Sequence, residues 1–356
     1  MRICLLGDTH FGIRGDSKVF HEYYEKFYSE TFFPILEKKG VRTIVQLGDL
    51  FDRRKYVNFF TLTESRRYFF DQCEKRGITL HALIGNHDIF WRESLDVNSP
   101  DLLLKDYKNI HLWSKPGTLE IDGIKFDMIP WICKENEQEV FEFIKNSSSP
   151  ICLGHFELAG FPFMRGVESH DGIDCKFLSS YNHVYSGHFH TRSQNNNVTY
   201  IGTPYELFWS DYKDPKVFGI IDTENLKIDY VQNPHRMFYK INYDDAKLTM
   251  EDILAIPYEK YTNAYVKVVV LNKQNPYLFD RMLDGLYKIN PVDVTIVEDF
   301  TVAEETTEEI VDQAQDTITI LSNYIDSQTL NISDTNKLKT LMRELYVEAL
   351  SQENTE

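Results

Sequence analysis

Two short apolar runs near the start of the chain each end in Gly-Asp, a pattern that indicates a buried strand followed by a loop. They span Arg2 to Gly7 and Arg42 to Gly48. Between them, Ser17 to Lys39 has aromatic and aliphatic residues at intervals of three and four, which predicts a helix that stops at Gly40. A strand, a helix and a strand in this order predict a parallel pair and an α/β fold.

The alternation continues, with a helix predicted over Asn58 to Arg76 and a strand over Ile78 to Ile84. Beyond Lys108 the pattern changes to short strands with tight turns, such as the Asp122-Gly123 turn, which predicts a second, largely antiparallel sheet. A helix is predicted over Asn136 to Lys145. Further strands are predicted at Ile151 to Gly154, His183 to Ser186, Val198 to Gly202, Val217 to Asp222 and Lys227 to Val231.

The pattern shifts again near Pro234, which divides the chain into a domain over 1–233 and a small α+β domain over 234–300. In the second domain, Ala264 to Val297 predicts a strand, a helix and a strand. Residues 301–309 are acidic and poor in apolar residues, as in a linker. Residues 310–356 have two helical apolar faces, which predict a helical tail.

The charge distribution bears on the partners that the chain can bind. The formal net charge is −17, which argues against a protein that holds nucleic acid through a globally basic surface. Residues 301–356 contribute 12 acidic and 3 basic side chains to this excess. Carboxylates that bind divalent cations would also be neutralised, so a phosphate-bearing substrate is disfavoured but not excluded.

Cysteine spacing and hydropathy indicate the compartment. The five cysteines, at positions 4, 73, 133, 152 and 175, have no metal-finger spacing and indicate reduced, buried thiols. The sequence contains neither a secretory signal nor an apolar stretch of membrane-spanning length. We therefore expect a cytoplasmic protein without membrane association.

Five polar clusters follow predicted strands, and together they predict a metal centre. Each alone is typical of a solvated turn. Ligands gather at the carboxyl ends of strands in α/β sheets, so groups that are distant in sequence can converge there. The clusters are Asp8-Thr9-His10, Gly48-Asp49, Gly85-Asn86-His87-Asp88, Gly154-His155 and Gly187-His188-Phe189-His190.

The ligand types favour two metal ions. Residues i and i+2 of an extended segment point the same way, so Asp8 pairs with His10, and His188 with His190. We expect Asp49 to bridge the ions, one of which is completed by Asp8, His10 and His190 and the other by Asn86, His155 and His188. Two such ions hold a hydroxide that attacks phosphorus. Carboxylate, imidazole and amide ligands suit Mn²⁺, with Zn²⁺ or Fe²⁺ as alternatives.

His87 follows a predicted ligand directly and is expected to protonate the leaving oxygen as a general acid. The alternative interpretation is that His87 is an ordinary loop histidine. We expect Asp88 to orient His87, and the alternative interpretation is that Asp88 caps the following helix.

At these residues the sequence resembles the calcineurin-like metallophosphoesterases, whose motif blocks occur here in the same order. Gly48-Asp49-Leu50-Phe51-Asp52 and Tyr200-Ile201-Gly202-Thr203-Pro204-Tyr205-Glu206 resemble the Mre11/SbcD nuclease branch, most of all the SbcD-like recombination endonuclease subunits of T4-like phages. This resemblance implies a two-sheet sandwich flanked by helices, a small capping domain that binds DNA and a helical C-terminal tail. It also implies a manganese-dependent DNA exonuclease and endonuclease that acts in DNA recombination, repair and degradation.

The resemblance further implies an SMC-like ATPase partner of the Rad50/SbcC type, bound by residues 310–356, and a homodimer. The dimer contact would form through helices at 58–76 and 94–108, with Phe59, Leu62, Phe69 and Phe70 as its apolar face; intrachain packing is the alternative. Some family members carry His where this chain has Asp52, and that His is tied to exonuclease action. The balance of exonuclease and endonuclease activity is therefore open.

Side chains near the predicted centre are candidate DNA contacts. Arg53, Arg54 and Lys55 follow the second cluster and could meet phosphates together with Asp52; a solvated basic turn is the alternative. Trp91, Trp131 and Trp209 could stack on bases, although packing is the commoner role. Two other functions remain open: a phosphomonoesterase or cyclic-nucleotide phosphodiesterase on the same centre, and a non-catalytic recombination scaffold.

Overall fold

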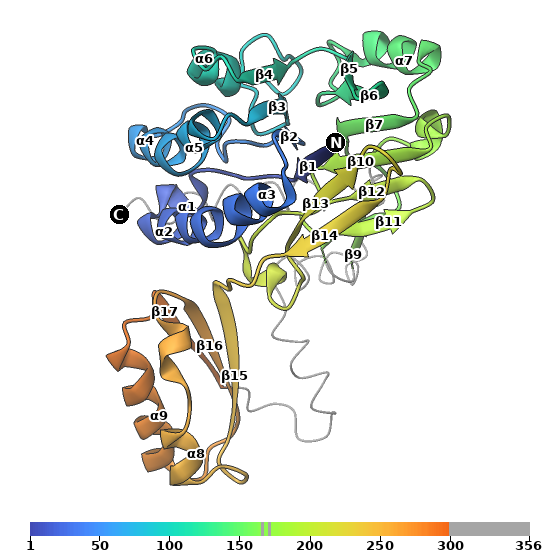
Figure 1. The fold of residues 1–356 in the computed structure, drawn as a ribbon. Helices are drawn as coiled ribbons and strands as arrows, with labels where there is room; N and C mark the ends of the chain where they lie inside the picture. The colour runs from blue at the N-terminus through green and yellow to red at the C-terminus, as the bar shows by residue number, and fades with distance from the viewer. Residues whose placement is uncertain (165–166, 170–171, 299–356) are drawn as a thin grey trace. The chain divides into compact units, whose positions relative to one another are not determined.

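The computed structural model describes residues 1–164, 167–169 and 172–298 (Figure 1). The predicted linker at 301–309 and the predicted helices at 310–356 lie outside this part of the chain. The described residues form two compact units. The larger unit contains residues 1–205 and 213–235, and the smaller contains 206–212 and 236–298.

The larger unit contains a mixed six-stranded sheet with the order β14-β13-β1-β2-β3-β4. Strands β1 to β4 are parallel, as the strand-helix-strand pattern predicts, while β13 and β14 are antiparallel to their neighbours. The strands are β1 (Arg2–Leu6), β2 (Thr43–Gln46), β3 (Thr79–Leu83), β4 (Ile110–Trp113), β13 (Val217–Asp222) and β14 (Ile228–Gln232).

A second six-stranded sheet has the order β11-β12-β10-β7-β6-β5. Its strands are β5 (Gly117–Ile121), β6 (Ile124–Ile129), β7 (Ile151–His155), β10 (His183–Gly187), β11 (Ser193–Asn195) and β12 (Val198–Tyr200). The prediction that this sheet is largely antiparallel is wrong. Its central pairs β6–β7, β7–β10 and β10–β12 are parallel, and only the outer pairs are antiparallel hairpins. Helix α7 (Glu137–Asn146) supplies the crossover that a parallel β6–β7 pair requires.

The two sheets pack face to face through an apolar layer, which confirms the predicted two-sheet α/β architecture. Ile3 and Val45 from the first sheet and Phe126 and Leu153 from the second belong to one buried cluster. Burial of such side chains stabilises the fold by roughly 1.5–3 kcal/mol each. This sandwich fixes the spacing between loops that leave the two sheets.

Helices cover the other face of the first sheet, and those from α2 to η2 are rich in aromatic residues (Figure 1). They are α1 (Ile13–Asp16), α2 (Lys18–Phe27), the π-helical turn η1 (Tyr28–Phe32), α3 (Phe33–Lys39), α4 (Phe59–Ser65), the π-helical turn η2 (Arg66–Phe70), α5 (Asp71–Lys75) and α6 (Ser99–Leu104). Their buried rings surround Phe11, which lies directly after the first candidate ligands.

Two residues that we expected on a dimer face lie instead in this aromatic layer. Phe69 and Phe70 are fully buried, with ring centroids 5.6 and 5.8 Å from that of Phe11. They fall in η2, where the wider π-helical turn shifts the apolar face relative to a regular helix. Phe59 remains 87% exposed on α4.

The smaller unit contains the parallel sheet β15-β16-β17, formed by β15 (Phe238–Asp244), β16 (Tyr265–Asn272) and β17 (Asp293–Glu298). Helix α9 (Pro276–Lys288) buries Phe279, Met282 and Leu286 in the same cluster as the β16 valines, together with α8 (Met250–Leu254). The remaining short elements of the described chain are β8 (Phe161–Met164), β9 (Val167–Ser169), η3 (Cys175–Leu178), η4 (Trp209–Asp211) and η5 (Tyr258–Tyr261). None of the helices in this part of the chain has the length and apolar character needed to cross a bilayer.

Candidate metal centre

All seven side chains that the sequence suggests as metal ligands lie in loops at, or directly after, the carboxyl ends of parallel strands. Asp8 and His10 follow β1, Asp49 follows β2 and Asn86 follows β3, all in the first sheet. His155 ends β7, while His188 and His190 follow β10, both strands of the second sheet. The sandwich brings the two sets of loops together.

One group of possible ligands consists of Asp8, His10 and His190. The Nε2 atoms of the two imidazoles are 3.1 Å apart. The Oδ2 atom of Asp8 lies 4.0 Å from Nε2 of His10 and 3.9 Å from Nε2 of His190. These three ligand atoms therefore surround a space of the size that one ion needs.

The second group consists of Asp49, His155 and His188, joined by Asn86. The amide oxygen of Asn86 lies 2.9 Å from Nε2 of His155 and 3.0 Å from Nδ1 of His188. Oδ2 of Asp49 lies 3.4 Å from Nε2 of His155 and 3.8 Å from Nε2 of His10. One carboxylate oxygen thus faces both groups, which is the position that a bridging ligand occupies.

The chemistry of the donors fits a cation better than it fits a closed hydrogen-bond network. Nδ1 of His155 is 2.7 Å from the carbonyl oxygen of Leu47, which can only accept, so Nδ1 carries the proton. In the neutral ring, Nε2 then presents a lone pair to the oxygens of Asn86 and Asp49, which are also lone-pair donors. A proton or a metal ion satisfies this arrangement, and the carbonyl orients the ring as such partners do in metal sites.

The pKa values of the candidate ligand side chains lead to the same conclusion. Burial raises the pKa of Asp8 to about 6. Burial disfavours the charged form of His10, but nearby carboxylates, first that of Asp52, outweigh it and raise its pKa to about 9. Burial is likewise outweighed at His155, where mainly the Asp49 charge raises the pKa to about 9. The pocket therefore attracts positive charge, as protons or as metal.

Two glycines permit the close approach of these loops. A Cβ on Gly85 would lie 2.2 Å from Oδ1 of Asp49, and a Cβ on Gly187 would lie 2.4 Å from Oδ1 of Asp8. Such distances are well below van der Waals contact. The glycine that precedes a ligand in these motifs is thus required by the packing of one ligand loop against another.

His87 belongs to neither of these two groups, although together with His10 and Asp52 it forms a third set of possible ligands. Its Nδ1 is 2.6 Å from the backbone carbonyl oxygen of Asp52, so Nδ1 must be the protonated nitrogen. Its ring centroid is 4.9 Å from that of His10. The remaining nitrogen, Nε2, is therefore the one that can exchange a proton with a bound molecule.

Asp88 is fully buried, and its carboxylate accepts hydrogen bonds from three backbone N–H groups. The donors are Gly85 at 2.9 Å, Phe51 at 3.1 Å and Leu50 at 3.3 Å. These contacts tie the loop after β3 to the loop after β2. Asp88 thus fixes the backbone around His87, because its carboxylate binds these three amide groups.

The basic residues after the second cluster differ in their surroundings. Arg53 forms an ion pair with Asp16 at 3.2 Å and lies over the ring of Tyr56. Lys55 is exposed and Arg54 is half-buried. Of the three tryptophans suggested as stacking residues, Trp131 lies against the centre, with its ring 5.2 Å from that of His188, while Trp91 is 55% exposed and Trp209 packs on Phe238 in the smaller unit.

Several supporting groups were missed because their contribution comes from the backbone or from distant positions. The carbonyls of Leu47 and Asp52, which orient His155 and His87, have no side-chain signature. The buried Lys216 donates to the carbonyl oxygen of His190 at 2.9 Å. The Tyr205 hydroxyl donates to the carbonyl oxygen of Thr9 at 2.7 Å, which gives the motif around Tyr205 a role in holding the first ligand loop.

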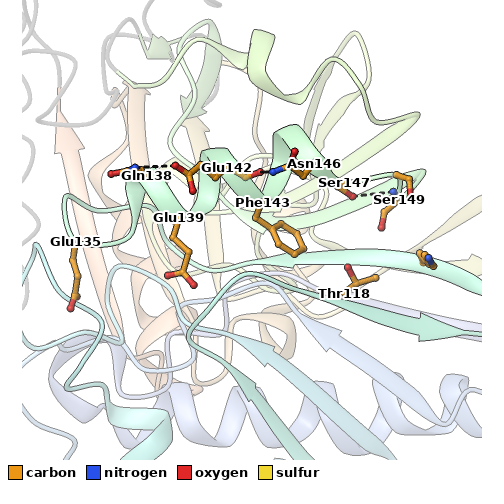
Figure 2. A pocket seen from close by; sticks show the side chains of 11 residues that line it. Thr118, Glu135, Gln138, Glu139, Glu142, Phe143, Asn146, Ser147 and Ser149 are labelled. Carbon is orange, nitrogen blue, oxygen red and sulfur yellow. Dashed lines mark hydrogen bonds between the residues drawn. The ribbon is translucent and has the colours of Figure 1, made fainter.

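A pocket of about 750 Å³ in the described part of the chain is lined by none of the candidate ligands (Figure 2). It lies beside helix α7 and strand β5, between Glu139, Glu142 and Phe143 on one side and Thr118 on the other. Because it contains no histidine and is lined mainly by acidic and small polar residues, its chemistry differs from that of the metal centre.

Comparisons with known proteins agree with the motifs. Residues 1–216 match the family model described as calcineurin-like phosphoesterase. The chain is 35% identical over 354 residues to "Exonuclease subunit 1" of Enterobacteria phage T4, covering 98% of this chain and 99% of the relative. A solved archaeal phosphodiesterase shares 16% identity over 65% of this chain and 99% of its own, with a TM-score of 0.33, which is too low to support an argument.

Proposed function

The chain belongs to the calcineurin-like phosphoesterase family, and from this premise we propose that it is a metal-dependent DNA nuclease with two metal ions. Members of this family are phosphoesterases that use divalent metals. The DNA substrate is proposed because the T4 relative, matched over nearly its full length, is named an exonuclease subunit. The observation that carries the metal-dependent chemistry is the position of Asp49, whose Oδ2 faces Nε2 of His10 and Nε2 of His155.

We assign one ion to Asp8, His10 and His190 and the other to Asn86, His155 and His188, with Asp49 shared. Two bound divalent ions supply positive charge that activates an attacking water and stabilises the charge of the phosphodiester in the transition state. Mn²⁺ is proposed because carboxylate, imidazole and amide ligands suit it. Leu47 and Lys216 hold the ligand-bearing backbone and rings in position for this binding.

His87 is proposed as the general acid. Its Nδ1 donates to the Asp52 carbonyl, so the acid is the ring protonated on both nitrogens, and the proton delivered to the leaving oxygen comes from Nε2. Proton transfer of this kind contributes typically 10²–10⁴-fold to a rate. We propose Asp88 as a positioning residue for His87 through the backbone amides that it binds, rather than as a group that meets the substrate.

DNA contacts beside the centre are assigned to Asp52, Arg54 and Lys55, which lie on the loop that also orients His87. Arg53 is already paired with Asp16, so its contribution to phosphate binding is proposed to be the smaller. Domain 234–300 is proposed as a capping domain that binds DNA.

Partners are proposed from the relative, which is named a subunit. We infer that the chain works with an SMC-like ATPase of the Rad50/SbcC type in DNA recombination and repair, with residues 310–356 as the docking segment. A homodimer is proposed through α4, where Phe59 is 87% exposed.

The test is Mn²⁺-dependent cleavage of linear duplex and single-stranded DNA by the purified chain, with and without the ATPase subunit. His87→Ala is the active-site variant. His183→Ala, an exposed histidine at the far end of β10, is the matched control. Cleavage that is lost in His87→Ala and kept in His183→Ala supports the proposal. No cleavage in any combination, despite two bound ions per chain, overturns it.

A further inference from the structure

The ring of His87 is oriented by one peptide group, that between Asp52 and Arg53. The carbonyl oxygen of this peptide accepts the Nδ1 proton of His87 at 2.6 Å. The preceding peptide is fixed separately, because the backbone N–H of Asp52 donates to the carbonyl oxygen of Phe11 at 3.1 Å. The position of the His87 ring therefore depends on how firmly the Asp52–Arg53 peptide is held.

The side chain that follows this peptide is anchored by an ion pair. Nη1 of Arg53 lies 3.2 Å from Oδ2 of Asp16, and the two side chains are only 16% and 10% exposed. The same guanidinium contacts the Tyr56 hydroxyl and lies 5.0 Å from the centre of its ring. A pair with this little exposure is weakly screened by solvent, so it holds its geometry better than a surface pair.

Asp16 is itself fixed by its backbone. Arg14, Gly15 and Asp16 have φ values of 51°, 69° and 62°, a run of three left-handed residues at the end of α1. Left-handed geometry in non-glycine residues costs free energy and persists only where surrounding contacts enforce it. The backbone N–H of Asp16 donates to the carbonyl oxygen of Gly12 at 3.0 Å, which closes this turn.

A chain of hydrogen bonds fixes the Asp16 carboxylate from its other side. The Thr61 hydroxyl donates to Oδ1 of Asp16 at 2.6 Å, and Nε2 of His21 lies 3.0 Å from the same hydroxyl oxygen. Because the hydroxyl proton points to Asp16, His21 donates to Thr61, and Nδ1 of His21 accepts from Tyr68 at 3.0 Å. All the donors and acceptors in this series of hydrogen bonds are compatible with a neutral His21.

We propose that Asp16 and Arg53 are positioning residues for leaving-group protonation: their ion pair holds the Asp52–Arg53 peptide so that its carbonyl fixes the His87 ring. This inference rests on the proposed role of His87 as general acid. It assigns a function to a charged pair that belongs to none of the groups of possible metal ligands. Loss of either charge frees the peptide to rotate, and the proton on Nε2 is then delivered in the wrong geometry.

The test compares two substrates that share a thymidine 5′-phosphate group. The 4-nitrophenyl ester has a leaving group that needs no proton, whereas a single-stranded oligonucleotide loses a sugar alkoxide that does. Asp16→Asn is the main variant, because Asn tolerates the left-handed backbone of Asp16. We expect its kcat with Mn²⁺ to fall on the order of tenfold for the oligonucleotide, a part of the usual general-acid contribution, and to stay within about twofold for the ester.

Further variants separate positioning from folding. Arg53→Met should reproduce the selective loss, and Arg53→Lys should recover part of it. Asp222→Asn, which breaks the exposed Arg2–Asp222 pair, is the matched control and should leave kcat unchanged for both substrates. In the metal-free protein, ¹⁵N NMR of the His87 ring should show the Nδ1–H tautomer in wild type and a mixture of tautomers in Asp16→Asn.

The outcomes distinguish this inference from the proposed function. If His87→Ala lowers kcat equally for both substrates, the general-acid role of His87 is wrong, and the inference is then overturned as well. If His87→Ala lowers kcat for the oligonucleotide alone and Asp16→Asn does not show this selective loss, only the positioning inference is overturned. Equal loss of both substrates in Asp16→Asn, with an unchanged His87 tautomer, also overturns it.

Discussion

The Nε2 atoms of His10 and His190 lie 3.1 Å apart, close enough that one proton must lie between them in the metal-free protein. Neighbouring carboxylates, first Asp52, outweigh burial at His10 and raise its pKa to about 9. Burial lowers the pKa of His190. The shared proton therefore belongs to His10, and an ion that binds both nitrogens has to displace it.

Metal binding should consequently release protons and strengthen as the pH rises. His10 and His155 both have a pKa of about 9 in the metal-free protein, and only the neutral ring binds metal. At pH 7.5 we expect a release that approaches two protons per chain, with the apparent affinity for Mn²⁺ increasing until the pH reaches about 9. Titration calorimetry in two buffers of different ionisation enthalpy measures the proton count. Identical heats in both buffers would contradict this assignment.

Asp49 should matter to both ions, and Asp8 to one. We expect Asp49→Asn to weaken Mn²⁺ binding at both sites by at least about 10–100-fold. Loss of a residue that only orients a metal ligand already costs this much, and Asp49 is proposed as a ligand itself. Asp8→Asn should weaken one site and leave the other close to wild type. Elemental analysis after equilibrium dialysis gives the number of ions per chain. Equal loss in the two variants would refute a bridging role for Asp49.

Gly85 should tolerate no side chain, because a Cβ there would lie 2.2 Å from Oδ1 of Asp49. We expect Gly85→Ala to displace that carboxylate, reduce metal content and destabilise the metal-free protein by about 1–3 kcal/mol. Gly40→Ala is the control, since Gly40 has φ +69° but a Cβ added there would meet no atom within 4 Å. It should lower the melting temperature slightly and leave metal content unchanged.

A buried carboxylate that is not among the candidate metal ligands should contribute to stability alone. Asp127 is fully buried and accepts hydrogen bonds from Thr118 at 2.8 Å, Ser149 at 2.6 Å and Tyr181 at 2.8 Å. Tyr181→Phe removes one bond to a charged acceptor, so we expect a loss of about 1.5–3 kcal/mol in the free energy of unfolding. Urea denaturation measures it, and DNA cleavage at 25 °C should be unaffected. A change in metal content would contradict this separation.

The sequence was sufficient to predict the α/β class, most strands and the loops that carry the candidate ligands. The reason is local: each motif combines an apolar strand, a glycine and a polar ligand within ten residues. The pairing of β6 with β7 could not be read in this way, because parallel and antiparallel neighbours share the same short apolar pattern. The burial of Phe69 and Phe70 was missed because the π-helical turn that shifts them leaves no periodic signal.

Within the site, residue identity could be predicted but orientation could not. The sequence predicts that Asp88 orients the His87 ring, whereas its carboxylate binds backbone amides and the ring is held by the Asp52 carbonyl. Main-chain oxygens are the same at every position of a sequence. Only the fold determines which of them faces a histidine.

The wide separation of the candidate ligands along the chain has a consequence for how the protein acquires its metal. Ligands from Asp8 to His190 belong to two sheets, so no fragment of the chain can present a complete site before both sheets have formed and packed. Metal should therefore load after the main folding barrier and slow unfolding without speeding refolding. It should raise stability only by mass action on the native state, by about 2.7 kcal/mol for each ion at a free concentration 100 times its Kd.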